Sequence, residues 1–130
     1  MKILIVDDME TRHELIAGWL STVTDEILEI YCVFSVEEAE DVFSDCYEFD
    51  YIFLDHDLGG PEFMLSDEYQ TGCTVADMIV ARNIQYKEIV VHSINLHGAM
   101  NIQYRLPQSV IIPFFTLVTM NTLPGNVFNH

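Results

Sequence analysis

Short aliphatic runs that end abruptly in polar side chains limit most strongly how this chain can fold. Residues 3–6 (ILIV), 51–54 (YIFL) and 89–91 (IVV) are uninterrupted apolar runs, and they are followed by DD, DHD and HS. Runs of this length without polar alternation predict strands buried on both faces, as in a parallel sheet covered by helices. The polar residues after them then mark the carboxyl ends of those strands.

Segments with helical spacing separate these runs. We expect strands at residues 3–6, 27–34, 51–54, 89–91 and 110–114, and helices at 10–21, 35–44, 75–82 (its end) and 96–105. Ser35, followed three residues later by Glu38, has the pattern of a helix N-cap. Alternating strands and helices predict an α/β fold: a doubly wound, five-stranded parallel sheet in the flavodoxin-like order 2-1-3-4-5, since five units are too few for a barrel.

Length favours one domain over residues 1–130. Two segments do not fit the simple pattern: an acidic inserted loop at about residues 57–72, and an irregular tail at about 116–130 that is interrupted by Asn, Pro and Gly. Inserted loops of that length are usually functional or disordered.

The charge of the chain excludes some partners. Twenty-one acidic residues against five Lys plus Arg give a formal charge of −16, which repels polymeric nucleic acid. A small phosphate ligand remains compatible, because bound cations can reverse the local field. Three cysteines without metal-ligand spacing, no signal-peptide pattern and no membrane-length apolar run indicate a cytoplasmic protein without membrane contact, and a homodimer is compatible with the sequence.

Carboxylates cluster where the predicted strands end. In an open α/β sheet, ligands bind outside the carboxyl ends of the strands. Asp7, Asp8 and Asp55 would therefore lie together, with Asp57 near them, and repulsion among them favours a bound divalent cation. Oxygen ligands favour Mg²⁺ or Mn²⁺ over Zn²⁺, although an added His would favour Mn²⁺ or Zn²⁺. The alternative is that Asp7 or Asp8 only caps the first helix.

Two histidines follow neighbouring strands. His56 and His92 could divide general-acid and general-base roles, with Asp57 as the third member of the catalytic set. The alternative is that each histidine is structural. His13, His97 and His130 are assigned to the surface.

Four further residues are candidates for phosphate binding. Arg12 would lie in the first turn of the helix that follows the acidic pair, either as a phosphate clamp or in a solvated pair with Asp8. Ser93, Asn95 and Gly98 precede or begin a predicted helix, where backbone N–H groups can bind anions. Ser93 or Asn95 could equally be the N-cap of that helix.

The chain has an acid pair after the first predicted strand, Leu54-Asp55 at the end of the third and Ser93, a small hydroxyl residue, at the end of the fourth. With these features, residues 1–115 resemble the receiver domain of two-component response regulators. The resemblance implies that Asp7 and Asp8 bind metal, that Asp55 is the phosphoacceptor and that Ser93 is the phosphate-sensing hydroxyl. Receivers carry a Lys at the end of the fifth strand, usually before a Pro, but here Ile112 precedes Pro113. Ordinary phosphorelay is therefore not expected.

Three separated motifs set the chain apart from ordinary receivers: DDMETR at 7–12, LDHDLGG at 54–60 and HSINLHGAMN at 92–101. In this order they resemble a narrower family, the cyclic-phosphate processing receiver-like domains. This resemblance implies action on a cyclic phosphate, either a 2′,3′-cyclic end or a cyclic nucleotide signal, by a metal-assisted phosphoesterase.

Two other functions stay open at this point. The same crevice could bind or sequester a cyclic nucleotide without cleaving it, which in a virus would blunt a defence signal of the host. Alternatively, a degenerate receiver could serve in protein contact through the apolar segment around Phe114 and Phe115.

Overall fold

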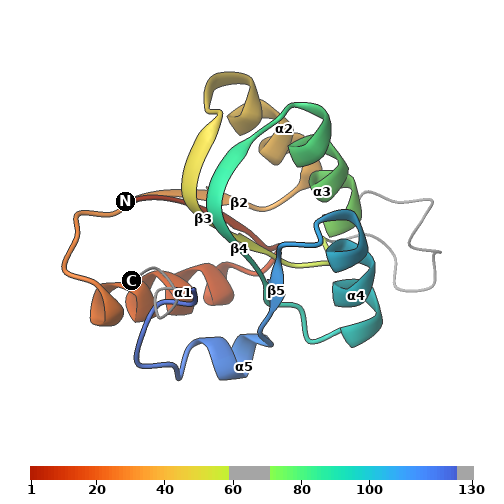
Figure 1. The fold of residues 1–130 in the computed structure, drawn as a ribbon. Helices are drawn as coiled ribbons and strands as arrows, with labels where there is room; N and C mark the ends of the chain where they lie inside the picture. Colours follow the sequence, from red (N-terminus) through yellow and green to blue (C-terminus); the bar gives the residue numbers. More distant parts are fainter. Residues whose placement is uncertain (59–70, 126–130) are drawn as a thin grey trace.

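The computed structural model describes residues 1–58 and 71–125. Within them, five parallel strands form one sheet in the order β2-β1-β3-β4-β5 (Figure 1), which confirms the predicted α/β fold and strand order. The strands are β1 (Lys2–Val6), β2 (Glu29–Val33), β3 (Glu48–Leu54), β4 (Gln85–Val91) and β5 (Val110–Ile111).

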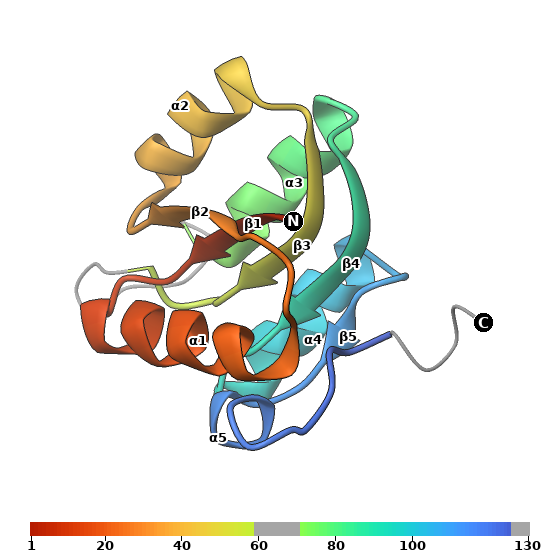
Figure 2. The same ribbon diagram turned by 90° about the vertical axis from the view of Figure 1, so that its left-hand side faces the viewer.

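Helices cover both faces of the sheet, as Figures 1 and 2 show. They are α1 (Glu10–Val23), α2 (Val36–Asp45), α3 (Gly72–Ala81), α4 (Leu96–Arg105) and α5 (Phe114–Leu117). Alternate residues of each strand enter two separate cores. Leu4 and Ile52 pack in the core beneath α2, α3 and α4, whereas Ile3 and Phe53 pack in the core beneath α1 and α5.

Side-chain caps fix where three of the helices begin. Ser35 accepts a hydrogen bond from the Glu38 amide, as the sequence predicts, and Thr71 and Asn95 cap α3 and α4 in the same way. Helix α1 begins after Met9 without a side-chain cap. The alternative that Asp7 or Asp8 serves as the N-cap of α1 is therefore wrong.

The second and fifth strands are shorter than the sequence predicts. Strand β2 begins at Glu29, and Ile27 before it is 91% exposed. Strand β5 ends at Ile111, since Pro113 cannot donate to a strand ladder and is the N-cap of α5.

Most of the predicted acidic loop lies outside the described residues. Only its two ends, 57–58 and 71–72, are described. The irregular tail is described as far as Gly125 and packs on the α1 side of the sheet. Trp19 Nε1 donates to Met120 O at 2.8 Å, and Tyr51 Oη donates to Pro124 O at 2.7 Å. None of the helices in the described part of the chain is both long and apolar enough to cross a bilayer.

Candidate metal and phosphate site

Asp7, Asp55 and His92 meet at the carboxyl edge of the sheet. Each follows directly on one of three neighbouring strands, β1, β3 and β4, and each is at most 1% exposed. One ligand atom from each side chain lies within 4.8 Å of the other two. His92 Nε2 lies 2.8 Å from Asp7 Oδ2. The topology thus brings together three side chains that are up to 85 residues apart in sequence.

Arg12 provides the positive charge beside these acids. Its Nη1 atom lies 3.6 Å from Asp7 Oδ2 and 3.4 Å from Asp55 Oδ2, so it pairs with these two buried acids and not with Asp8. The guanidinium carbon lies 5.5 Å from the centroid of the Phe114 ring, a distance at which a cation–π interaction forms. The chain lacks the lysine that receivers carry at the end of the fifth strand. The positive charge beside Asp55 comes instead from Arg12 of α1.

The two buried acids have opposite pKa shifts. Burial alone would raise the pKa of Asp7, but the hydrogen bonds from His92 and the Met9 amide, with the charges of His92 and Arg12, hold it below its ordinary value. Burial raises the pKa of Asp55 to about 6, and the neighbouring Asp7 adds to the rise, while His92 and Arg12 only partly offset it. At neutral pH the cluster thus holds a carboxylate whose charge is poorly compensated.

The donor set fits a divalent cation. Two carboxylates and one imidazole, all buried, could hold a metal ion. His92 Nδ1 is buried without a hydrogen-bond partner among the described residues. Asp8, the third predicted ligand, is exposed and does not belong to this group. An imidazole thus stands where the sequence predicted a third carboxylate.

His56 belongs to a second group of contacts, on the α3 and α4 side. Its ring is buried and its Nδ1 lies 2.9 Å from Asp57 Oδ1. A hydrogen bond with Cys73 and the contact with Asp57 outweigh burial and raise the pKa of His56 to about 8. Gly98 leaves room for this ring, because a Cβ there would lie 2.4 Å from His56 Cγ.

Cys73 is a site residue that the sequence did not reveal. Burial would raise the pKa of its thiol, but the hydrogen bond with His56 and the charges of Arg105 and His56 lower it below its ordinary value. Its place as the second residue of α3 is compatible with a stabilised thiolate. No local pattern around Cys73 could have indicated this, since His56 reaches it only through the fold.

The remaining phosphate candidates are engaged in local hydrogen bonds. Ser93 is buried, and its Oγ accepts from the Asn95 amide at 3.1 Å. Asn95 Oδ1 accepts from the Gly98 amide at 3.0 Å, which confirms Asn95 as the helix N-cap. The Asn95 side chain is exposed, so its amide group stands at the surface beside the site.

His13 is not on the surface, and its assignment there is wrong. It is 3% exposed, its Nε2 lies 2.7 Å from Asp7 O, and its ring lies 4.2 Å from the Phe34 ring. His13 thereby fixes the backbone that carries Asp7. His97 is exposed, as expected, and His130 lies outside the described residues.

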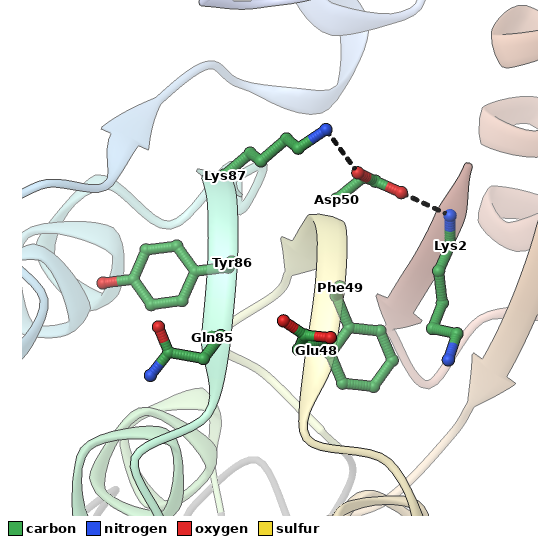
Figure 3. A pocket seen from close by; sticks show the side chains of 7 residues that line it. All are labelled: Lys2, Glu48, Phe49, Asp50, Gln85, Tyr86 and Lys87. Atoms are coloured by element: carbon green, nitrogen blue, oxygen red, sulfur yellow. Dashed lines mark hydrogen bonds and ion pairs between the residues drawn. The ribbon is translucent and has the colours of Figure 1, made fainter.

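A cavity of about 420 Å³ lies at the opposite, amino edge of the sheet (Figure 3). It is lined by residues that begin β1, β3 and β4: Lys2, Glu48, Phe49, Asp50, Gln85, Tyr86 and Lys87. The Asp50 carboxylate accepts from the Lys2 amide at 2.7 Å and pairs with Lys87 Nζ at 2.9 Å. These contacts join three strands, and none of the motif residues lies there.

A family model shows what class of domain this fold and site define. The model of the Cyclic-phosphate processing Receiver domain matches residues 2–108, and the chain belongs to that family. Comparison with curated protein sequences gives no match.

Solved structures with the same fold include response regulators. NtrX from Brucella abortus is 26% identical with a TM-score of 0.62, over 86% of this chain and 22% of that one. A response regulator from Burkholderia pseudomallei, with a phosphorylated aspartic acid, calcium ion and citrate, is 16% identical with a TM-score of 0.61, over 98% and 62%. The bacteriophytochrome response regulator AtBRR is 17% identical with a TM-score of 0.59, over 88% and 85%. This chain thus spans about a fifth of NtrX.

Proposed function

We propose that the protein is a metal-assisted phosphoesterase that opens a cyclic phosphate, either a 2′,3′-cyclic end or a cyclic nucleotide signal. The observation that carries this proposal is the buried group of Asp7, Asp55 and His92, whose three ligand atoms converge. Membership of the cyclic-phosphate processing family supports the substrate class.

Asp7, Asp55 and His92 would hold the cation. A divalent ion there supplies Lewis-acid polarisation of the phosphoryl oxygens. Arg12, which already lies within 4 Å of both acids, binds a phosphate oxygen and offsets its charge. His92, proposed from sequence as an acid or base, serves instead as a ligand, because it is fully buried and bonded to Asp7.

His56 donates the proton in this proposal. With a pKa of about 8 it is mostly an imidazolium at neutral pH, as a general acid must be. Water forms a bond to phosphorus and releases one proton to the solvent, the ring P–O bond breaks, and the leaving oxygen takes the proton of His56, which the imidazole then regains from the solvent. Asp57 orients the imidazole through Nδ1. Asn95, with its exposed amide, provides a further contact to the phosphate. Ser93 holds the turn before α4 through its hydrogen bond with the Asn95 amide, and Gly98 leaves room for the His56 ring.

Turnover of a panel of cyclic mono-, di- and oligonucleotides and of 2′,3′-cyclic ends, with Mg²⁺, Mn²⁺ or Zn²⁺, tests the proposal. We expect His56→Ala to lower kcat by about 10²- to 10⁴-fold, the usual contribution of a general acid. His97→Ala, a change of an exposed histidine outside the site, should leave kcat unchanged. Absence of hydrolysis in the wild type, or equal activity of both variants, would contradict the proposal.

A second function, binding of the same ligand without cleavage, is favoured by one observation. Arg12 already pairs with both buried acids, so the site carries a partial counter-charge of its own. A sequestering protein needs only such a charged receptor and no proton transfer. Calorimetry that shows tight binding, with the ligand recovered intact after long incubation with each metal, would support this function over catalysis.

A further inference from the structure

Phe114 lies beside two residues of the candidate site. It is the first residue of α5 and only 3% exposed. The centroid of its ring lies 5.5 Å from the guanidinium carbon of Arg12 and 6.4 Å from the centroid of the His92 ring. Helices α1 and α5 lie on the same face of the sheet (Figures 1 and 2), so Arg12 and Phe114 meet although they are far apart in sequence. Its burial leaves little of the Phe114 ring for a ligand.

Phe115 extends this aromatic contact to the surface. Its ring centroid lies 5.3 Å from that of Phe114, with an angle of 78° between the planes, an edge-to-face arrangement that aromatic pairs favour. Phe115 is nevertheless 70% exposed and belongs to neither core of the described residues. A phenyl ring left in water forgoes the free energy that its burial would provide. Neither the packing of the fold nor the proposed reaction therefore accounts for this side chain.

Two more apolar side chains are exposed in connections at the same edge of the sheet. Met9 lies between β1 and α1 and is 45% exposed, and Ile94 lies between β4 and α4 and is 57% exposed. Like the start of α5, both connections follow strands and therefore lie at the carboxyl edge, with the proposed metal ligands. A ligand made only of phosphate and hydroxyl groups would leave these apolar side chains in water. The edge therefore suits a ligand with an apolar part next to its phosphate.

We propose that Phe115 stacks against the base of a nucleoside cyclic phosphate whose phosphate binds at Arg12. In such a molecule one ribose ring separates the phosphate from the base. In the protein one aromatic ring, that of Phe114, separates the Arg12 guanidinium from Phe115. Stacking accepts every base, because each base has a π-face. This inference rests on the proposed function and deepens it: the substrate is a nucleotide of any base, and Phe115 determines the specificity for it.

The experiment compares ligands that differ only in the base. Adenosine cyclic phosphate carries a base, and the matched methyl β-riboside cyclic phosphate carries a methoxy group in its place; each is used in its 2′,3′- and its 3′,5′-cyclic form, with Mn²⁺ present. Both members of a pair have the same charge, so the repulsion from a chain of formal charge −16 is the same for both.

The quantity measured is the preference for the adenosine compound within each pair. Calorimetry gives the Kd of a ligand that stays intact, and initial rates give kcat/KM for one that is hydrolysed. We expect a preference of about 5- to 100-fold in the wild type, the usual contribution of one stacked base.

Three substitutions at Phe115 identify the contact. Phe115→Ala should abolish the preference, Phe115→Tyr should keep it, and Phe115→Leu, which is apolar but has no π-face, should keep only a small part of it. Tyr104→Ala is the control, because it removes an aromatic side chain that is 86% exposed near the end of α4, away from the carboxyl edge. This control should match the wild type. Circular dichroism checks that each variant folds, and Phe115→Leu takes the place of Phe115→Ala if the latter does not.

The outcomes separate this inference from the proposed function. Adenosine compounds that bind with the expected preference but are recovered intact would support stacking and contradict the phosphoesterase. Hydrolysis of both members of each pair with equal kcat/KM would do the reverse. A wild type that binds neither member overturns the inference. So does a preference that survives Phe115→Ala, or one that is equal in Phe115→Leu and Phe115→Tyr.

Discussion

At the scale of single residues, Gly98 decides where the imidazole of His56 can lie. A Cβ at Gly98 would lie 2.4 Å from His56 Cγ, so Gly98→Ala must displace the ring. We expect this variant to lose about 1–3 kcal/mol of unfolding free energy, as overpacking usually costs. Urea unfolding measures the loss, and the ¹H–¹⁵N resonances of His56 report the displacement of the ring.

Gly18 is the control for this substitution. It is also a helix glycine, but a Cβ there meets nothing within 4 Å. Gly18→Ala should therefore stabilise the protein by about 0.4–1 kcal/mol, through the lower entropy of the unfolded chain. If Gly98→Ala were as stable as Gly18→Ala and left the His56 resonances in place, the contact would be absent in solution.

The thiol of Cys73 should react faster than an ordinary cysteine. Its pKa lies below the ordinary value because His56 and Arg105 favour the thiolate more than burial disfavours it. In His56→Ala burial remains and the hydrogen bond is lost, so the pKa rises and the thiolate fraction at neutral pH falls. We expect alkylation by iodoacetamide to slow about tenfold or more at pH 7.

The measurement follows the pH dependence of the alkylation rate in a background with Cys32→Ser and Cys46→Ser, so that only Cys73 reacts. The midpoint should lie below 9 with His56 present and should move to higher pH without it. An unchanged midpoint would mean that His56 does not contact the thiol.

Contacts between side chains that lie far apart in the sequence could not be predicted from it. The patterns after the strands located Asp7, Asp55 and His92, because strand ends in a parallel sheet share one edge. They could not show that Phe114, 102 residues away along the chain, lies under the Arg12 guanidinium. Nor could they show that His13 is buried, because that depends on Phe34 of another segment.

At the scale of elements, Asp50 joins the amino ends of three strands. Its carboxylate bonds the Lys2 amide of β1 and the Lys87 ammonium of β4 (Figure 3), and these contacts lower its pKa. A carboxyl group with a lowered pKa stabilises the fold above its unfolded pKa, near 3.8, and loses this effect as pH falls through the folded value.

Asp50→Asn should therefore cost about 1 kcal/mol of unfolding free energy at pH 7 and nothing at a pH well below 3.8. Denaturant titrations at several pH values measure the difference from the wild type. Lys87→Ala is the comparison, with a smaller expected loss because the Lys87 side chain is 78% exposed. The loss of unfolding free energy in Asp50→Asn could instead persist undiminished in acid. It would then come from packing and not from charge.

Element boundaries were predictable where a local signal fixes them. Ser35 located the start of α2 and Asn95 that of α4, because caps depend on residues three apart. The sequence extended β5 to residue 114, but the strand ends at Ile111. Its length depends on pairing with Val90 and Val91 of β4, which is a tertiary contact.

At the scale of the whole molecule, the formal charge of −16 makes specific cation binding hard to distinguish from general stabilisation by salt. Every added cation screens the repulsion among the acids and stabilises the fold, whether or not it occupies the cluster of Asp7, Asp55 and His92. A thermal shift on adding metal is therefore evidence for the site only when it exceeds the shift from monovalent salt of equal ionic strength.

We expect Mn²⁺ to raise Tm beyond that shift, because a ligand that binds only the native state stabilises it by RT ln(1 + [L]/Kd). At a Mn²⁺ concentration of about 100 Kd the gain is about 2.7 kcal/mol. EDTA should reverse it. The gain should be smaller at pH 5 than at pH 7, because the pKa of Asp55 is about 6 and protons then compete with the ion.

Asp55→Asn provides the decisive comparison. By itself it should raise Tm at pH 7 without metal, since it removes a buried carboxylate whose charged form is disfavoured. It should abolish the extra shift from Mn²⁺ and leave the monovalent salt effect intact, because the overall charge changes by only one. If Mn²⁺ raised the Tm of Asp55→Asn beyond the monovalent salt effect by as much as it raises that of the wild type, the ion would be bound among the surface acids. The metal would then have no part in the proposed mechanism.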